Sequence, residues 1–287
     1  MKHRKMNDIY RFYTYQKIPQ NQSLKYLITI PCVNREERNA IQIIDKTFEN
    51  FEKQGIFQHY PHFTVDILLF ESGSKSLSYL QFIKSFHEKY PGRIKIMLSK
   101  RNLDGPQNIY RMFSYIQQQA IHHYDFCIWM DDDILVCKNF LQNMDSWVRQ
   151  HINFTIFGSL YSPYQSYPIQ NPNMSSYCQE SFVRSYHGSC CTIFKPLLAK
   201  YITPLWFKTE KLRFVKEPDL RFRESIMKFF PNIKKFLVCS PSIVQHLNIG
   251  SAIYQHKQIR KGHTARHFIG IEEDPLWYSQ NELSIDK

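Results

Sequence analysis

The sequence predicts an α/β fold, in which helices cover both faces of a mostly parallel β-sheet. Short apolar runs with strand character alternate four times with longer segments that carry apolar residues at helical spacing, as a parallel sheet with helical crossovers requires. The chain has 287 residues, 43% of them hydrophobic, and can therefore bury a large core. We expect a single domain over 1–287, with a first half at 24–150, a second half at 151–256 and a C-terminal tail at 257–287.

The first strand and the first helix are expected before residue 56. LKYLITI at 24–30 is mostly apolar and ends at Pro31, which predicts a buried strand. Asn34 is a favourable N-cap residue and Glu37 lies three positions later, as in a capping box, so we expect a helix to begin at Asn34. Apolar residues then recur at helical spacing up to Gly55, which predicts the end of this helix.

The remaining elements of the first half are predicted from apolar runs with strand character and from apolar residues at helical spacing. Its last strand is buried and leads into three aspartates. The expected elements are a strand at 65–70, a helix at 76–90, a strand at 94–98, a helix from Pro106 to about Ala120, a strand at 125–130 and a helix at 139–150.

The second half has a different composition. SLYSPYQSYPIQNPNMSSYCQE at 159–180 is rich in Ser, Tyr, Pro and Asn, and predicts a long loop that is either a substrate lid or a structural cover. An apolar stretch (GSCCTIFKP), a charged helix (EPDLRFRESIMKFF), a strand (KFLVCS) and a polar tail follow. These elements predict an extension of the same domain rather than a second one.

Charge and cysteine content narrow the functional classes. Lys and Arg number 37 against 25 Asp and Glu, a net charge of +12, which indicates a nucleotide, nucleic-acid or acidic membrane partner, or else a solvated basic surface. No apolar signal segment opens the sequence, and no run reaches the ~18 apolar residues of a membrane span. The seven cysteines form no C-x-x-C pair, so neither a zinc site nor a disulfide framework is predicted. We expect a cytoplasmic protein, or a luminal one if the chain belongs to a longer, anchored protein.

Polar segments follow each of the four predicted strands of the first half. In an open parallel sheet, ligands bind beyond the carboxyl ends of the strands, so these segments are expected to line one site. In chain order they are PCVNRE, ESGS, SKRNLDGPQN and DDD.

Asp131, Asp132 and Asp133 directly follow the apolar run FCIWM. Adjacent like charges repel and lose hydration when they are buried, and a bound divalent cation would compensate both effects. Alternate residues of an extended segment point the same way, so Asp131 and Asp133 are expected to share Mn²⁺ or Mg²⁺, directly or through water. A capping cluster at a helix start is the alternative, because aspartate also favours N-caps.

The other strand exits hold candidate ligands for a nucleotide. Lys100, Asn102 and Asn108 provide a cation and two amides near a helix N-terminus, which suits a phosphate or ribose, although a capped and solvated turn has the same composition. Glu71 would accept a hydrogen bond from a base or ribose, or else be solvated. The first exit would meet a nucleotide base or ribose through Pro31, Val33, Asn34 and Arg35.

Several common nucleotide and hydrolase motifs are missing from the sequence. It contains no G-x-x-x-x-G-K-[ST] and no G-x-G-x-x-G, so a P-loop or a dinucleotide site is not predicted. It also contains no G-x-S-x-G and no H-E-x-x-H. The remaining pattern is a nucleotide held by aspartates and a metal without a glycine cradle.

Four segments in order, TIPCVNRE, DILLFESGS, the three aspartates and PSIVQHLNIGSAI (241–253), resemble glycosyltransferases of the GT-A fold. The resemblance is greatest to the N-acetylglucosaminyltransferase IV family and its bacterial relatives. That family has a strand exit of the form T/G-I-P-T-V-x-R-E, an acidic E-D-D metal motif and a terminal P-S-L-x-Q-H-x-G-x-x-S-S segment. The likeness covers most of 26–256 but hardly includes 155–215.

The resemblance implies a nucleotide-sugar donor, such as a UDP-sugar and possibly UDP-GlcNAc, a divalent metal, and transfer of the sugar to an acceptor hydroxyl with inversion. It matches Asp131 and Asp133 to the metal motif and places Asp132 beside the donor ribose or sugar. His246 matches the terminal Q-H, near the metal or diphosphate, and neutral imidazole is itself a good metal ligand. Outside such a motif, a single histidine is more often a packed or surface residue.

Direct displacement at the anomeric carbon also needs a carboxylate that takes the proton of the acceptor hydroxyl. In GT-A enzymes that invert the anomeric centre, this base usually lies well after the metal motif, at the start of a helix. EPDLRFRE offers Asp219 as the first choice and Glu217 as the second. The alternative is that both are ordinary carboxylates matched to the helix dipole.

The sequence departs from the eukaryotic family in the middle region and in the first residue of the metal motif, which is Asp rather than Glu. The implied acceptor is therefore a glycan, a lipid-linked glycan or a protein. The segment RFRESIMKFFPNIKK is either a core helix with a basic outer face or a peripheral contact with an anionic membrane.

Two other functions compete with sugar transfer. A metal-dependent nucleotidyltransferase shares the αβ layout and the carboxylates, but it normally has a Gly-rich loop after the first strand, and PCVNREERN contains no Gly. A basic nucleic-acid-binding protein is the non-enzymatic alternative. The sequence has no recognisable nucleic-acid motif, and three aspartates repel phosphates, so we expect no nucleic-acid partner.

Overall fold

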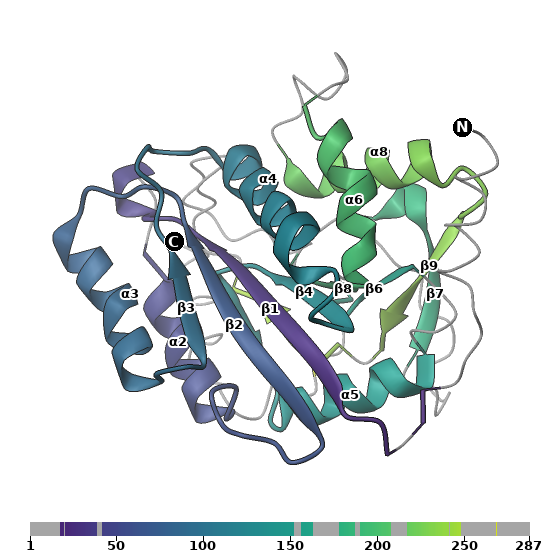
Figure 1. Ribbon diagram of the computed structural model, residues 1–287, viewed down its shortest axis with the longest axis horizontal. Coiled ribbons are helices and arrows are strands. Elements are labelled where there is room, and N and C mark those ends of the chain that lie inside the picture. The colour runs from purple at the N-terminus through teal and green to yellow at the C-terminus, as the bar shows by residue number, and fades with distance from the viewer. Residues whose placement is uncertain are drawn as a thin grey trace, which may run out of the picture.

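An eight-stranded β-sheet runs through the centre of the molecule (Figure 1). Its strands lie side by side in the order β3 (Ile94–Met97), β2 (Phe63–Glu71), β1 (Leu24–Cys32), β4 (Phe126–Met130), β8 (Cys191–Phe194), β6 (Phe157–Ser159), β9 (Lys235–Cys239) and β7 (Cys178–Phe182). A two-stranded sheet pairs β5 (Ile134–Val136) with β10 (Val244–His246). The computed structural model describes residues 18–19, 21–38, 42–151, 156–162, 178–186, 190–207, 217–240, 242–247 and 268.

The sheet is mostly parallel but mixed, which confirms the predicted α/β class. β3, β2, β1 and β4 are parallel neighbours, and β6 is parallel to β9. β8 runs antiparallel to both β4 and β6, and β7 runs antiparallel to β9. The predicted second half therefore adds its strands to the same sheet, with β8 joined directly to β4.

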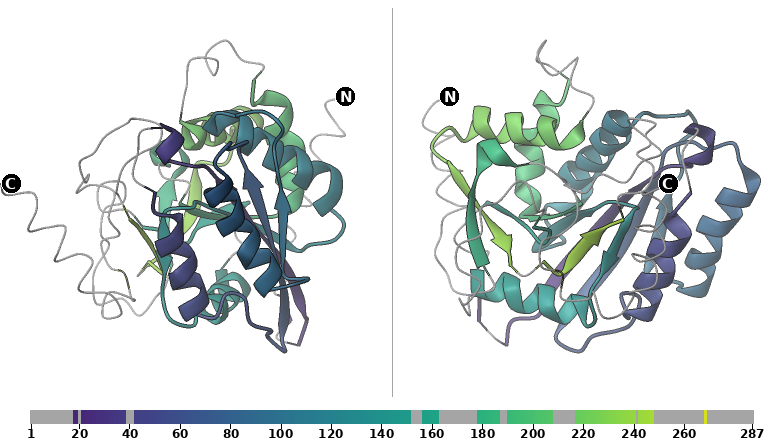
Figure 2. Two further views of the ribbon diagram at one scale, coloured as in Figure 1. Left: turned by 90° about the vertical axis from the view of Figure 1, so that its left-hand side faces the viewer. Right: turned by 180° about the vertical axis from the view of Figure 1, so that it is seen from behind.

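Helices cover both faces of the sheet, as predicted (Figures 1 and 2). Residues of β4 alternate between the two cores, since Ile128 and Met130 face one and Cys127 and Trp129 face the other. The first core includes residues of α2 (Ile44–Lys53), α3 (Leu77–Lys89) and α5 (Phe140–His151). The second core includes residues of α4 (Gly105–Tyr115), α6 (Ala199–Ile202) and α8 (Pro218–Phe229).

The predicted helix start at Asn34 is wrong, because α2 begins at Ile44. The Asn34 side chain does not cap a helix: its Nδ2 donates to Ser74 Oγ at 3.1 Å, and its Oδ1 accepts from the Glu36 N–H at 3.1 Å. The chain forms only a short 3₁₀ turn, η1 (Glu36–Arg38), at this point. The predicted end of the helix is confirmed, since Gly55 follows it with a φ of +73°.

The predicted loop at 159–180 is only partly tested. Residues 163–177 lie outside the described part of the chain. Its last residues begin the edge strand β7, in which Cys178 pairs with Cys239 of β9. Local composition does not reveal this strand, because its partner lies 61 positions later in the chain.

Short turns connect the longer elements. The helix that was expected to reach Ala120 continues from α4 into a π-helical turn, η2 (Ile116–Ala120). The others are 3₁₀ turns, namely η4 (Val183–Ser185), η5 (Pro196–Leu198) and η6 (Thr203–Leu205). Within the described ranges, no helix combines the length and the hydropathy needed to cross a bilayer.

Candidate active site

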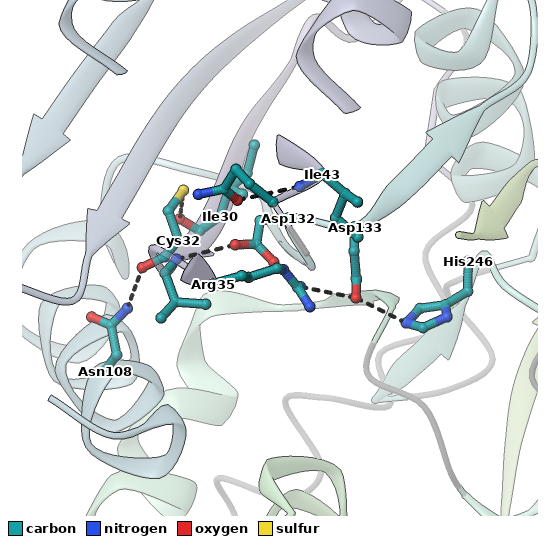
Figure 3. Close-up of polar contacts among 10 residues, drawn as sticks. Ile30, Cys32, Arg35, Ile43, Asn108, Asp132, Asp133 and His246 are labelled. Carbon is teal, nitrogen blue, oxygen red and sulfur yellow. Dashed lines mark hydrogen bonds and ion pairs between the residues drawn. The ribbon is translucent and has the colours of Figure 1, made fainter. Parts of the chain in front are cut away.

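Most of the predicted site residues gather where the carboxyl ends of the parallel strands meet. Figure 3 shows Arg35, from the exit of β1, between Asp132 and Asp133, from the exit of β4. His246 lies on the other side of Asp133. The strand-exit rule for parallel sheets thus brings the first and fourth polar segments together.

Asp131, Asp132 and Asp133 form the link between β4 and β5, and two hydrogen bonds hold the backbone of this link. The Asp131 N–H donates to the Cys190 carbonyl oxygen at 3.0 Å, and the Leu247 N–H donates to the Asp133 carbonyl oxygen at 2.9 Å. β4 is buried along its whole length, so the three carboxylates begin where the apolar strand ends.

Arg35 neutralises part of the aspartate cluster. Its Nη2 lies 2.6 Å from Asp132 Oδ1 and 2.9 Å from Asp133 Oδ2. The Val33 N–H donates to Asp132 Oδ2 at 3.1 Å, so both oxygens of Asp132 bind protein donors. Asp132 therefore ties the first strand exit to the fourth, and its contact with the donor ribose or sugar remains a prediction.

Burial and charge act in opposite directions on the pKa values of this cluster. Burial raises the pKa of Asp132 above its ordinary value, against the effect of Arg35. Burial also acts to raise the pKa of Asp133, but the charges of His246 and Arg35 lower it by more, and the net pKa lies well below the usual range. Burial acts to lower the pKa of Arg35, but the charges of the aspartates raise it by more. The net pKa lies above its ordinary value, so this guanidinium stays charged.

His246 reaches the cluster because β10 pairs with β5. In this pairing His246 lies opposite Ile134, the residue after Asp133. Its Nε2 is 3.2 Å from Asp133 Oδ2 (Figure 3). Of the predicted motif at 241–253, only residues 242–247 belong to the described part of the chain.

Few side chains at this site are placed to coordinate a metal ion. The ranges that the structure describes contain no group of three or more His, Cys, Asp or Glu side chains arranged to hold a metal ion. A hard cation such as Mg²⁺, however, commonly takes one or two carboxylates and completes its shell with water and substrate phosphates. Two ligands at right angles and about 2.1 Å from such an ion lie about 3.0 Å apart. The 3.2 Å between Asp133 Oδ2 and His246 Nε2 is close to this spacing but is also an ordinary hydrogen-bond distance, so a metal held by Asp131, Asp133 and His246 stays a prediction.

Asp219 lies within electrostatic reach of the same cluster. Burial raises the pKa of the Cys190 thiol, and the negative charges of Asp131, Asp133 and Asp219 raise it further. One buried sulfur atom thus experiences the field of all three carboxylates. The charge of Asp219 therefore acts on the same buried thiol as the charges of Asp131 and Asp133.

The first turn of α8 is held in place through α4. Trp206 Nε1 donates to the Pro106 carbonyl oxygen at 2.8 Å, and Arg221 Nη1 donates to the Trp206 carbonyl oxygen at 2.7 Å. Glu217 occupies the N-cap position of α8 and Asp219 lies in its first turn, as predicted. The base assignment itself, with Asp219 first and Glu217 second, stays a prediction.

The first strand exit provides both buried and accessible groups. Asn34 is 2% exposed, and its contacts with Ser74 and Glu36 join the first exit to the second. Pro31 and Val33 are partly exposed, so a ligand can reach them. Asn34 thus shapes the loop that presents Pro31 and Val33.

Glu71 and Asn108 are buried beneath the site rather than exposed to it. The carboxylate of Glu71 accepts from the Gly73 N–H at 2.7 Å and from the Ser74 N–H at 2.9 Å. Asn108 Nδ2 donates to the Phe70 carbonyl oxygen at 2.6 Å. Both side chains brace the end of β2, and their predicted contacts with a nucleotide are not tested.

The third exit is exposed and is fastened to the first. Lys100 and Asn102 are both exposed. Arg38 Nη2 lies 3.3 Å from Asn102 Oδ1 and donates to the Leu103 carbonyl oxygen at 2.5 Å. Arg38 therefore joins two exits that sequence reasoning had treated separately.

Sequence reasoning missed Cys190, Arg38 and Gly73. Gly73 has a φ of +94°, and a Cβ at this position would lie 2.1 Å from the Arg101 carbonyl oxygen, so the second and third exits pack against each other there. A glycine directly after a strand was a usable signal for such a close approach. Cys190 gave no signal, because a cysteine in an apolar run is typical of a core.

Comparison with solved structures identifies the class of fold. The structure of GalNAc-T7 with UDP, GalNAc and Mn²⁺ matches with a TM-score of 0.53 and 11% identity, over 78% of this chain and 43% of that chain. The S. aureus TarS 1–349 structure matches with a TM-score of 0.49 and 15% identity, over 76% of this chain and 58% of that chain. Its complex with UDP matches with a TM-score of 0.48 and 15% identity, over 76% of this chain and 61% of that chain.

The GalNAc-T7 match and the sheet topology together define an α/β protein of the GT-A type. The chain spans about three-fifths or less of the length of these solved structures. No protein-family model matches the sequence. No curated protein matches it either.

Proposed function

We propose that the protein is a metal-dependent glycosyltransferase that moves a sugar from a nucleotide-sugar donor to an acceptor hydroxyl. One observation supports this above all. Asp133 of the DDD segment, paired with Arg35 and His246, lies at the carboxyl edge of a GT-A-type sheet. The solved neighbours include complexes with UDP and with Mn²⁺, which agrees with this donor class.

The donor is a UDP-sugar in this proposal. Its base and ribose meet the accessible residues of the first exit, Pro31 and Val33, while Lys100 and Asn102 offer a cation and an amide from the third exit. Arg35 holds Asp132 and Asp133 in place before any ligand binds, so the site is organised in advance.

Asp131, Asp133 and His246 would hold the divalent metal, Mn²⁺ or Mg²⁺. When bound, the metal stabilises the negative charge that develops on the departing diphosphate. In the absence of a metal, the charges of His246 and Arg35 hold the pKa of Asp133 well below the usual range; beside a metal His246 would be neutral, and Arg35 would still favour the ionised carboxylate. Asp133 therefore presents a full negative charge at neutral pH.

Asp219 would act as the base, with Glu217 as the second candidate. The carboxylate takes the proton of the acceptor hydroxyl as the hydroxyl oxygen attacks the anomeric carbon, and the bond to the diphosphate breaks. Attack from the face opposite the leaving group inverts the anomeric centre. The position of Asp219 in the first turn of α8, and its charge effect on the same Cys190 thiol as Asp131 and Asp133, support this choice.

The sugar and the acceptor follow from the sequence resemblance to the N-acetylglucosaminyltransferase IV family. UDP-GlcNAc is the first donor to test. A glycan, a lipid-linked glycan or a protein is the proposed acceptor class.

A thermal-shift panel tests the donor site. UDP, UDP-GlcNAc, UDP-GalNAc, UDP-glucose and ATP are compared with and without Mn²⁺ on the wild-type protein, on Asp133→Ala and on Asp125→Asn. Asp125 is an exposed aspartate at the opposite end of β4, and its carboxylate accepts from the Lys25 N–H, so it is a matched control. A ligand that binds only the folded state raises the melting temperature by mass action.

We expect stabilisation by UDP or a UDP-sugar that needs Mn²⁺, is lost in Asp133→Ala and is kept in Asp125→Asn. A shift with ATP alone would favour a nucleotidyltransferase. The absence of a shift with every nucleotide would contradict the proposal and favour the nucleic-acid-binding alternative.

A further inference from the structure

A pocket of about 460 Å³ lies beside the edge strand β7, at the end of the sheet farthest from β3. Its lining residues come from the end of β7, the turn η4, the last turn of α8 and the link from α8 to β9. Its lining includes Phe182, Val183, Arg184, Met227, Ile233 and Lys234. Asp219 of the candidate active site and Met227 of the pocket are eight positions apart on α8, about 12 Å along the helix at 1.5 Å of rise per residue.

The lining of this pocket is mainly apolar. Val183 and Ile233 are buried in its lining, and Met227 is partly buried. Phe182, on the edge strand, keeps 49% of its surface exposed. A half-exposed phenylalanine next to an apolar hollow indicates a binding surface rather than a solvated strand end.

Cations surround the mouth of the pocket. The Arg184 guanidinium lies 5.2 Å from the centre of the Phe182 ring, and Lys228 and Lys234 are exposed nearby on α8 and on the link to β9. In the part of the chain that the structure describes, none of these three cations makes an ion pair. The neighbouring acids are already paired, Glu180 with Lys235 and Glu224 with Arg223.

We propose that this pocket receives a hydrocarbon chain of an anionic membrane lipid, with Arg184 and Lys234 facing the lipid phosphates. A soluble anion would not need the apolar hollow, and an uncharged apolar ligand would not need three unpaired cations. An anionic amphiphile needs both. The volume lies within the roughly 300–1,000 Å³ of ligand pockets and suits one chain rather than a whole lipid.

The contact involves the end of α8, not its length. Phe222 and Ile226 are buried in the core, so the apolar face of the helix is not available to a membrane. This burial agrees with the first of the two sequence interpretations, a core helix with a basic outer face, and the docking surface is the pocket with Arg184 and Lys234 in its lining. This proposal does not depend on sugar transfer.

Vesicle sedimentation tests the proposal. Wild-type protein is mixed with vesicles of phosphatidylcholine alone and with vesicles containing 30% phosphatidylglycerol, at low and at physiological salt. We expect sedimentation only with the anionic vesicles. Arg184→Gln with Lys234→Gln should weaken partitioning roughly thirtyfold, since each cation near an anionic leaflet contributes about a fivefold factor. Phe182→Ser should weaken it about tenfold by removing apolar contact.

Matched controls exclude a general effect of charge or hydrophobicity. Lys95→Gln removes an exposed lysine from β3, and Leu77→Ser removes an apolar side chain that is 74% exposed on α3. Both should sediment like the wild type. No sedimentation of the wild type, or an equal loss in the control variants, would overturn the proposal.

A photoreactive group at the chain end of phosphatidylglycerol gives a second readout that does not need a variant. The cross-linked peptide should contain residues between Met227 and Lys234. Labelling confined to other peptides would also overturn the proposal, and inorganic phosphate at millimolar concentration should not prevent labelling if the lipid chain is required.

Discussion

Arg35→Met should destabilise the protein strongly, because it leaves two buried carboxylates without their cation. Asp132 and Asp133 are 4% and 7% exposed, and Arg35 lies within 2.9 Å of both. Removing one partner of a buried ion pair typically costs about 3–5 kcal/mol, since the other charge is left uncompensated. For a chain of this size, about 2 °C of melting temperature corresponds to 1 kcal/mol, so the expected loss is roughly 6–10 °C.

The measurement is a thermal or urea unfolding curve of the ligand-free protein, followed by circular dichroism. Arg101→Met is the control, because Arg101 is exposed and its substitution should change stability by no more than about 0.5 kcal/mol. Adding Asp132→Asn to Arg35→Met should restore part of the loss, since one buried charge is then removed. A loss below about 2 °C in Arg35→Met, equal to the control, would refute the view that this guanidinium holds the aspartates together.

Three further predictions concern the site. Asp219→Asn should lower the rate of sugar transfer at least about a hundredfold and leave UDP binding unchanged. Glu224→Gln, on the same helix, is the control and should stay near the wild-type rate. Normal turnover of Asp219→Asn with UDP-sugar and acceptor would rule out Asp219 as the base. Gly73→Ala should lower the free energy of unfolding by well over 1 kcal/mol, because its Cβ would meet the Arg101 carbonyl oxygen at 2.1 Å. Gly92→Ala is the control, with a φ of +78° and open space around the added Cβ, and should cost only about 1 kcal/mol. Equal denaturation midpoints of the two variants would contradict this packing at Gly73. Stabilisation by UDP in a thermal-shift assay should disappear with EDTA and return with excess Mn²⁺, and an EDTA-insensitive shift would show that the nucleotide binds without a metal.

The sequence was sufficient to predict the first four strands and the edge of the sheet at which the polar segments after β1 and β4 meet. β1, β2 and β4 are continuous apolar runs because they are buried on both faces, and this pattern is visible locally. The residues that follow these strands leave the buried sheet, so their polar side chains mark the strand ends. The helix start at Asn34 was wrong, because its side chain bonds to Ser74, 40 positions away, instead of capping the helix that local pattern indicated.

The second half was harder to predict, because its strands pair with distant partners. β7 looks like part of a polar loop until it is paired with β9, and β8 joins the sheet antiparallel to β4 rather than through another helical crossover. Short strands of mixed composition carry little local signal, and their direction depends on which edge of the existing sheet is free.

The residue types at the site were determined by the sequence alone: three aspartates after a buried strand, a histidine in a terminal motif and carboxylates at a helix start. Only the tertiary structure decided how they are joined. Arg35 reaches Asp132 across 97 positions of chain, and β10 brings His246 to Asp133. Such contacts depend on the packing of whole strands and helices, so no local pattern of charge or hydrophobicity could have predicted which carboxylate is neutralised and which remains available to a ligand.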